Sequence, residues 1–232
     1  MKNSILITLC LLAISCSQKE HEGWVSIFNG ENLEGWHIYL KGTDNFNGWY
    51  VDNGILVFDP ANRTEASNAD LVTDKKYSSF ELSIEWMISE KGNSGIFWGV
   101  IEDSTYVHTY ETGPEIQVLD DNWSDYVDSR GDIQRAGSLF NVIAPSKIVS
   151  KPANQWNHYL IRIDHRKNEG LVLFNNTEIM QFPVHGPEWE KLKASSGFKD
   201  WPGFGISRSG HLALQDHGNQ VAYRNIKIRE LR

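Results

Sequence analysis

Phe80-Glu81-Leu82-Ser83-Ile84-Glu85-Trp86-Met87-Ile88 is the stretch that decides the fold of this chain. Apolar side chains occupy every second position from 80 to 88, and Glu81, Ser83 and Glu85 stand between them. Successive side chains of a β-strand point to opposite faces, so the pattern predicts a strand with one buried face and one polar face.

The same alternation recurs along most of the chain, and helical patterns are scarce. Residues 49–58 contain Asn53-Gly54 and residues 171–182 contain Asn175-Asn176, which predict hairpins because Asn and Gly tolerate the positive φ of tight turns. Further strands are expected at residues 24–28, 95–101, 105–110, 115–119, 137–143, 157–165, 203–206, 211–215 and 220–228. About a dozen short strands favour two packed sheets over one open sheet, so we expect an all-β sandwich of antiparallel sheets.

Two segments depart from the strand pattern. Residues 187–194 predict a surface helix, with Pro187 in its first turn and charged residues on its outer face. Residues 120–135 are rich in Asp, Asn and Ser, and so long a loop is typical either of a binding loop or of disorder.

The first residues carry the pattern of a bacterial lipoprotein signal. Lys2 precedes a short apolar stretch, and Ala13-Ile14-Ser15-Cys16 fits a site where the Cys thiol is acylated and the chain is cleaved before it. We therefore expect a signal peptide at residues 1–15, a lipidated Cys16 with a polar tether at residues 16–23, and one domain at residues 24–232. Acyl chains on Cys16 would hold the protein at the cell envelope, on the outer membrane and facing either the periplasm or the surface.

The remaining composition limits the partners. The only other cysteine, Cys10, lies in the expected signal, so the domain must fold without a disulfide. The formal net charge of −8 comes with scattered Lys and Arg and no basic stripe, which argues against a nucleic-acid partner.

The 9 tryptophans fit a carbohydrate partner, because flat indole rings stack on the apolar faces of sugars. Five of them lie inside apolar strand patterns and are expected to fill the core: Trp24, Trp36, Trp49, Trp86 and Trp156. Trp98 and Trp123 lie beside Gly-rich or polar loops and are the better candidates for sugar contact.

Gly113-Pro114-Glu115-Ile116-Gln117-Val118-Leu119-Asp120 is the stretch richest in candidate chemistry. If Ile116 and Val118 enter the core, Glu115 and Gln117 lie together on the outside of their sheet. Glu85 also leaves the non-core face of its strand, so the two carboxylates could share one polar surface if their strands are neighbours.

Residues 211–218 repeat this arrangement near the end of the chain. With Leu212 and Leu214 inward, His211, Gln215 and His217 point outward. An imidazole titrates near neutral pH, so His217 beside a Glu is a candidate general base or metal ligand. Arg224 stands in phase with the apolar Ile226 and must either mark a bulge or turn inward to a carboxylate.

Together these motifs resemble the 3-keto-disaccharide hydrolase family, which is abundant among Bacteroidetes lipoproteins. The resemblance is carried in chain order by residues 93–97, residues 113–120, Gly137-Ser138-Leu139-Phe140, Trp156-Asn157, and residues 214–218 with Arg224-Asn225-Ile226. It implies a concanavalin A-like, jelly-roll sandwich that binds its ligand on the concave face of one sheet, and action on glycosides oxidised at C3.

A ketone at C3 acidifies the proton on C2, so a base can remove that proton and the C1 substituent can leave. On this reading either His217 or Glu115 is the base, and the other polarises the substrate directly or through a divalent metal. No cofactor is identified with certainty. Six residues would contact the sugar: Glu85, Gln117, Gln215, Trp98, Asp120 and Trp123.

Two other functions stay open at this point. A conventional glycoside hydrolase needs two carboxylates roughly 5 to 9.5 Å apart, whereas this chain places Gln117 between Glu115 and Asp120. A non-catalytic sugar-binding module would keep the aromatic contacts without needing His217.

Overall fold

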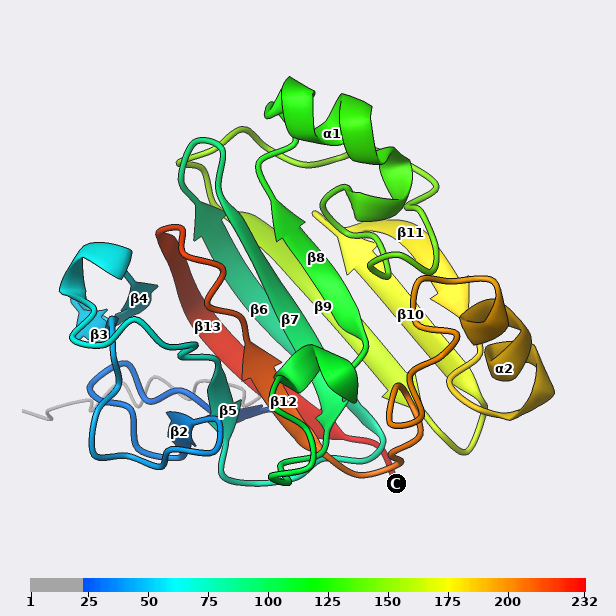
Figure 1. Cartoon of the computed structure of the whole chain (residues 1–232), viewed down its shortest axis with the longest axis horizontal. Helices are drawn as coiled ribbons and strands as arrows, with labels where there is room; N and C mark the ends of the chain where they lie inside the picture. Colours follow the sequence, from blue (N-terminus) through cyan, green and yellow to red (C-terminus); the bar gives the residue numbers. More distant parts are fainter. Residues whose placement is uncertain (1–22) are drawn as a thin grey trace, which may run out of the picture.

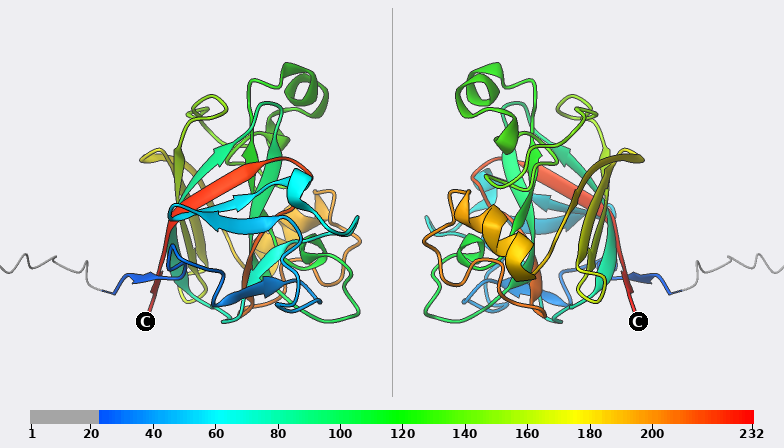
Figure 2. Two further views of the ribbon diagram at one scale, coloured as in Figure 1. Left: turned by 90° about the vertical axis from the view of Figure 1, so that its left-hand side faces the viewer. Right: turned by 90° about the vertical axis from the view of Figure 1, so that its right-hand side faces the viewer.

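The computed structural model describes residues 23–232, so the expected signal peptide, Cys16 and nearly all of the tether lie outside the described residues. Its strands form two antiparallel sheets that lie one in front of the other in Figure 1 and are seen from the sides in Figure 2. The eight-stranded sheet has the order β11 (Thr177–Phe182), β10 (Glu169–Phe174), β9 (Asn157–Asp164), β6 (Phe80–Ile88), β13 (Val221–Glu230), β4 (Ile55–Phe58) and β3 (Trp49–Asp52), with β1 (Val25–Ser26) beside β13. The five-stranded sheet has the order β2 (Trp36–Ile38), β5 (Leu71–Thr73), β12 (His211–Leu214), β7 (Asn93–Val100) and β8 (Glu115–Leu119).

The core lies between the sheets and confirms the alternation seen in the sequence. The apolar positions of β6 are all buried there, and Trp86 has no exposed surface. The opposite sheet contributes Ile116 and Val118 from β8 and Leu212 and Leu214 from β12. Truncating a fully buried side chain such as Trp86 to Ala typically costs about 3–5 kcal/mol, so this layer holds the two sheets together.

Both predicted hairpins are confirmed. Asn53 and Gly54 have φ of 48° and 82° between β3 and β4, and Asn175 and Asn176 have φ of 47° and 64° between β10 and β11. Two successive positive φ values match the right-handed twist of the flanking strands.

Three of the predicted strands are wrong. Residues 105–110 form a loop that ends in the short helix η2 (Thr109–Glu111), and residues 203–206 are a turn. Residues 137–143 make only isolated bridges, although Gly137 and Phe140 donate backbone hydrogen bonds to Gln117 and Glu115 along the edge of β8. Residues 137–143 lie along a sheet edge, whereas Val107 and Ile206 are exposed, so alternation of apolar residues arises in all three segments without a continuous ladder.

The helices also correct the sequence analysis. Residues 120–135, expected as a loop, contain α1 (Ser124–Arg130) and η3 (Asp132–Gln134). The expected helix is present as α2 (Gly186–Ala194), but Trp189 is only 2% exposed and fixes α2 to the domain, so α2 is more than a surface element. A further short helix is η1 (Pro60–Asn62), and within residues 23–232 no helix is long and apolar enough to span a membrane.

Two of the five tryptophans expected in the core lie elsewhere. Trp36, Trp49 and Trp86 are buried in it. Trp24 and Trp156 are only partly buried and carry arginine side chains over their rings, with the guanidinium carbon of Arg229 5.0 Å from the Trp24 ring centroid and that of Arg224 4.0 Å from that of Trp156. Their apolar rings are covered by cation–π contacts instead of core packing.

Candidate active site

A pocket of about 340 Å³ lies on the outer face of the five-stranded sheet. Its polar side chains come from two neighbouring strands, β7 and β8, from the turn that follows β12 and from the segment after η3: Asn93, Glu115, Gln117, Gln215, His217 and Asn141. A larger groove of about 910 Å³ lies where the two ends of the described chain meet, but its Lys75 and Glu230 are engaged with each other and it contains no histidine. The smaller pocket is therefore the candidate active site.

Strand alternation places the polar groups in this pocket. Ile116 and Val118 of β8 point into the core, so Glu115 and Gln117 point outward. Leu214 is likewise in the core, and Gln215 and His217 reach the pocket. Because β7 pairs with both β8 and β12, the two predicted groups, Glu115 and His217, line the same pocket from either side of β7.

Glu115 is held in an unusual environment for a carboxyl group. It is 6% exposed, and its side chain lies so close over Gly95 that the Cβ atom of any other residue at position 95 would overlap Oε1 of Glu115. In the orientation that satisfies its neighbours, the Gln117 amide donates to Glu115 Oε1 at 2.9 Å and to Ser94 O at 3.0 Å. Burial, with a smaller contribution from the charge of Asp70, raises the pKa of Glu115 well above its ordinary value.

His217 lies at the open side of the pocket and has the opposite protonation preference. Packing around the ring lowers its pKa, and this outweighs the effect of the Asp216 carboxylate, which raises it. Its Nε2 is 3.4 Å from the amide nitrogen of Asn93. A lowered pKa favours the neutral imidazole, which can accept a proton at neutral pH.

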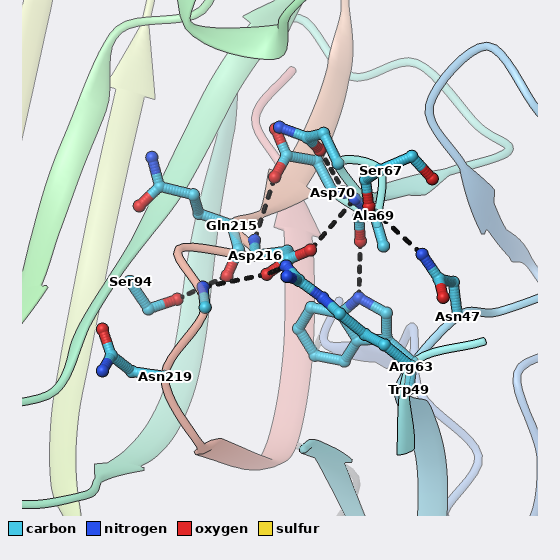
Figure 3. Close-up of polar contacts among 12 residues, drawn as sticks. Asn47, Trp49, Arg63, Ser67, Ala69, Asp70, Ser94, Gln215, Asp216 and Asn219 are labelled. Atoms are coloured by element: carbon cyan, nitrogen blue, oxygen red, sulfur yellow. Dashed lines mark hydrogen bonds and ion pairs between the residues drawn. The ribbon is translucent and has the colours of Figure 1, made fainter. Parts of the chain in front are cut away.

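Gln215 offers an unused hydrogen-bond acceptor. Its backbone is fixed on both sides, because its N–H donates to Gly95 O at 2.9 Å and its carbonyl accepts from Ser94 Oγ at 2.8 Å. Its side chain extends away from the Asp216 carboxylate in Figure 3. Oε1 of Gln215 is buried and has no partner within the described residues, so it is available to a ligand hydroxyl.

Two buried carboxylates, Asp70 and Asp216, stabilise the turn that lines the pocket, and neither was identified from the sequence as functional. Asp70 Oδ1 accepts from Asp216 N at 2.9 Å, and Asp216 Oδ2 accepts from Ala69 N at 3.1 Å (Figure 3). Arg63 forms an ion pair with Asp216. Burial, with the adjacent Asp216 charge, raises the pKa of Asp70 to about 6 although hydrogen bonds oppose the shift. This cluster fixes the turn that carries Gln215 and His217.

The apolar wall of the pocket comes from loops and was also missed. It consists of Tyr110, Phe140, Phe198 and Trp201. Tyr110 belongs to η2, Phe140 follows η3, and the other two lie in the segment after α2. The Asp200-Trp201-Pro202-Gly203 turn is the one sequence signal that could have indicated Trp201, since it exposes an aromatic residue in a polar loop.

Glu85 does not share a surface with Glu115, and that expectation was wrong. Its strand, β6, belongs to the eight-stranded sheet, whereas β8 belongs to the five-stranded sheet. Arg224 and Asn225 each donate a hydrogen bond to one oxygen of the Glu85 carboxylate, at 2.7 and 2.8 Å. A register shift after Arg224 confirms the bulge and explains why this arginine is in phase with apolar residues.

Three further predicted contact residues also lie outside the pocket lining. Trp98 is 6% exposed and packs on Phe182 in the core. Asp120 accepts from the backbone N–H groups of Lys91 and Asn122, so its carboxylate closes a turn. Trp123 begins α1 and packs on Tyr126. Their loop positions resembled those of contact residues, but each side chain is used for packing or capping.

A metal held by Glu115 and His217 finds little support in the arrangement of the site. Among residues 23–232, no group of three or more His, Cys, Asp or Glu side chains is placed to hold a metal ion. The remaining polar side chains in the pocket are amides and the Tyr110 hydroxyl, and burial of Glu115 raises its pKa and so disfavours the carboxylate form that binds metals.

Comparison with known proteins places this architecture in a family. A Bacteroides thetaiotaomicron protein named 3-keto-disaccharide hydrolase is 29% identical over 235 residues, covering 90% of this chain and 79% of that protein. The crystal structure of a candidate glycosyl hydrolase from Parabacteroides distasonis superposes with a TM-score of 0.81 at 30% identity, covering 90% of this chain and 95% of that one.

The fold is shared more widely. A Bacillus subtilis protein with a galectin-like fold aligns over 85% of this chain and 90% of its own, with a TM-score of 0.51 and 10% identity, and so supports the sandwich fold alone. The sequence model of the 3-keto-alpha-glucoside-1,2-lyase-like domain matches residues 23–229. The chain therefore belongs to the family of 3-keto-alpha-glucoside-1,2-lyase-like domains, the 3-keto-disaccharide hydrolase family.

Proposed function

We propose that this protein is an enzyme that cleaves 3-keto-glycosides by base-catalysed elimination, with or without subsequent addition of water. The names of the family and of its Bacteroides relative support the substrate class. The observation that carries the proposal is the pairing, in one pocket, of the nearly buried Glu115, whose pKa is raised, with His217, whose pKa is lowered.

His217 is the base in this scheme. Its neutral imidazole removes the C2 proton, and the electron pair of the C–H bond moves toward C3, placing negative charge on the ketone oxygen. Collapse of this enolate forms the C1–C2 double bond and breaks the bond from C1 to the leaving oxygen. That oxygen takes up a proton, for which the imidazolium formed in the first step is the nearest source.

Glu115 stabilises the enolate in this scheme. Burial raises its pKa well above the ordinary value and so favours the protonated form, which can donate a hydrogen bond to the C3 oxygen. The Gln117 amide occupies one of its oxygens, which directs the other toward the ligand. Gln215 Oε1, buried and without a partner among the described residues, would accept from a sugar hydroxyl.

The site fits a conventional two-carboxylate glycosidase less well. That mechanism needs a second carboxyl group about 5 to 9.5 Å from the first. Among the described residues, Glu115 is the only acidic side chain that lines the pocket. Gln117 occupies the position of the middle carboxylate, and Asp120 is committed to its turn.

The test is turnover of a 3-keto-glucosyl disaccharide in D₂O, with the unoxidised disaccharide as the control substrate. Elimination removes the C2 proton, so the product is either an enone or, after water adds, a free 3-keto sugar that carries deuterium at C2. Direct hydrolysis leaves the original hydrogen in place. Incubating free 3-keto-glucose with the enzyme in D₂O measures any exchange of the product itself.

The variants His217→Asn and Glu115→Gln should each lower kcat by about 10²–10⁴-fold while the sugar still binds. Mass spectrometry of the product and calorimetric titration of the substrate measure the two properties. Cleavage of the unoxidised sugar, or retention of hydrogen at C2, would contradict elimination. Binding without turnover of either sugar would identify a binding module.

We further propose that Cys16 anchors the enzyme to the cell envelope, which rests on the apolar stretch and the Ala13-Ile14-Ser15-Cys16 sequence. Expression in a bacterial host with a radiolabelled fatty acid should label the wild-type protein and leave Cys16→Ala unlabelled. The variant should also lose its detergent-dependent solubility. Equal labelling of both proteins would contradict the anchor.

A further inference from the structure

The candidate pocket has two halves that differ in chemistry and in origin. Its polar half lies on the five-stranded sheet, where β8 carries Glu115 and Gln117 and the turn just beyond β12 carries Gln215 and His217. Its aromatic half comes from η2, which carries Tyr110, and from the segment after α2, which carries Phe198 and Trp201. A ligand in the pocket must touch both halves, so each half can recognise a different part of it.

The aromatic half is held in place before any ligand binds. The Trp201 ring is 5.7 Å from that of Tyr110 and 5.4 Å from that of Phe198, the latter edge-on at 85°. Phe198 stacks at 4.0 Å on Phe204, which in turn stacks on the buried Trp189 of α2. This chain of rings connects the pocket to a helix that is anchored in the domain.

The other end of the aromatic half is fixed by the buried carboxylate cluster. Thr109, the neighbour of Tyr110, donates its hydroxyl hydrogen to Asp70 Oδ2 at 2.5 Å. Asp70 also accepts from Asp216 N, which belongs to the turn that carries His217. One buried side chain therefore connects the segment that bears Tyr110 to the segment that bears the proposed base.

We propose that Trp201 and Tyr110 form the platform for the leaving group of the substrate. This inference rests on the proposed function. The atoms that react are C1, C2 and C3 of the keto sugar, so this ring must lie on the polar half within reach of His217 and Glu115. The substituent on C1 then extends toward the aromatic half, where a ring with a flat apolar face can stack.

The platform defines a substrate class. It selects leaving groups that present such a face, either a second pyranose or an aryl group, over small alkyl groups. Side chains on the platform make no contact with the reacting atoms, so Trp201 and Tyr110 are specificity-determining residues and not catalytic ones.

The test compares two substrates that share the 3-keto-glucosyl half and differ in the leaving group, a phenyl glycoside and a methyl glycoside. Trp201→Ala should lower kcat/KM about 10-fold or more for the phenyl substrate, as expected for the loss of a stacked ring, and less than about 3-fold for the methyl substrate. Trp201→Phe should recover part of the loss. Tyr110→Leu, on a separate loop, should show the same selectivity if Trp201→Ala fails to fold.

Trp24→Ala is the matched control, because Trp24 lies outside the pocket lining and its ring is covered by Arg229. It should leave the ratio of the two kcat/KM values unchanged. Equal losses on both substrates would place Trp201 against the keto sugar and overturn the proposal, as would no loss on either. If the wild-type enzyme cleaves neither 3-keto-glycoside, the proposed function itself fails, and the two failures are thereby distinguished.

Discussion

Two buried glutamates, one on each sheet, have pKa values shifted in opposite directions although their strands show the same alternation. Glu81 of β6 and Glu115 of β8 both alternate with core residues, and both are almost completely buried, with a side-chain exposure of 2% for Glu81 and a residue exposure of 6% for Glu115. Glu81 lies between Arg162 and Arg229 and hydrogen-bonds to both. Glu115 has the Gln117 amide as its neighbour and no ion pair with a described residue.

The side chains next to each glutamate decide the direction in which its pKa is shifted. Burial would raise the pKa of Glu81, but the hydrogen bonds and charges of Arg229 and Arg162 outweigh burial and lower it. Among the described residues no cation compensates the burial of Glu115, and its pKa rises. The eight-stranded sheet thus uses its glutamate as a structural anion, whereas burial on the five-stranded sheet favours the protonated form of Glu115.

The largest expected effect comes from a substitution at a neighbouring residue that displaces the Glu115 carboxyl group. In Gly95→Ala the new methyl group would overlap Oε1 of Glu115, so the carboxyl group must move. We expect kcat/KM on a 3-keto-glycoside to fall about 100-fold, because a displacement of roughly 1 Å in a catalytic group can cost that much. Thermal melting should show that the variant remains folded, and full activity in a folded variant would contradict the proposed role of Glu115.

Breaking the ion pairs of Glu81 with Arg162 and Arg229 on the eight-stranded sheet should lower stability without changing the candidate active site. We expect Glu81→Gln to lower the free energy of unfolding at pH 7 by about 1–3 kcal/mol, less than for a fully buried pair because the two arginines are 32% and 40% exposed. The lowered pKa of Glu81 means that this contribution is present above its unfolded value of 4.5 and is lost as the pH falls through the folded value.

Urea denaturation of wild type and Glu81→Gln at several pH values measures this contribution. The exposed Glu178 on β11 provides the control, because Glu178→Gln should change stability by less than about 0.5 kcal/mol. Equal effects of the two substitutions would show that the arginine pairs contribute nothing measurable.

Glu115→Gln should change the free energy of unfolding in the opposite direction from Glu81→Gln. The pKa of Glu115 is raised in the folded state, so the folded protein keeps a proton that the unfolded chain releases above pH 4.5. Wild-type stability therefore decreases as the pH rises above that value, by at most ~1.4 kcal/mol per pH unit from this group, and Gln removes the dependence. The variant should gain stability over wild type between pH 5 and pH 8. A constant difference across this range would show that Glu115 is ionised.

A smaller effect is expected from His37 of β2, whose imidazole contacts the carboxylates of Asp74 and Glu102. His37 Nδ1 is 2.6 Å from Asp74 Oδ1, and His37 Nε2 is 2.9 Å from Glu102 Oε2. Burial lowers the pKa of His37, but both carboxylates act against this and raise it overall, while the pKa of Glu102 is lowered. His211 also faces Glu102, at 4.0 Å.

Removing this imidazole with His37→Gln should cost about 0.3–1 kcal/mol, because Asp74 is largely exposed. The contribution of His37 is fully present below its unfolded pKa of 6.5 and is lost as the pH rises through the folded value, and that of Glu102 requires a pH above 4.5. The difference in stability should therefore be largest between about pH 4.5 and 6.5. A difference that grows above pH 8 would contradict the assignment.

Sequence alternation predicted the all-β sandwich, both Asn-containing hairpins and the outward faces of Glu115, Gln117, Gln215 and His217. These features depend on side-chain direction within one strand, which period-2 patterns report directly. The catalytic and contact roles of the four residues stay predictions. The pattern was misleading at residues 105–110 and 137–143, because alternation of apolar and polar residues also occurs where no continuous ladder of backbone hydrogen bonds forms.

What the sequence by itself determined is therefore local: which side chains leave which face of each strand, and where the chain turns. Only the tertiary structure decided that Glu85 and Glu115 lie on different sheets, that Trp201 and not Trp98 reaches the pocket, and that burial raises the pKa of Glu115. Strand pairing joins residues far apart in the chain, and a pKa depends on whatever lies nearby in space, as Asp70 does for Glu115 across 45 positions of sequence. No window along the sequence contains that information.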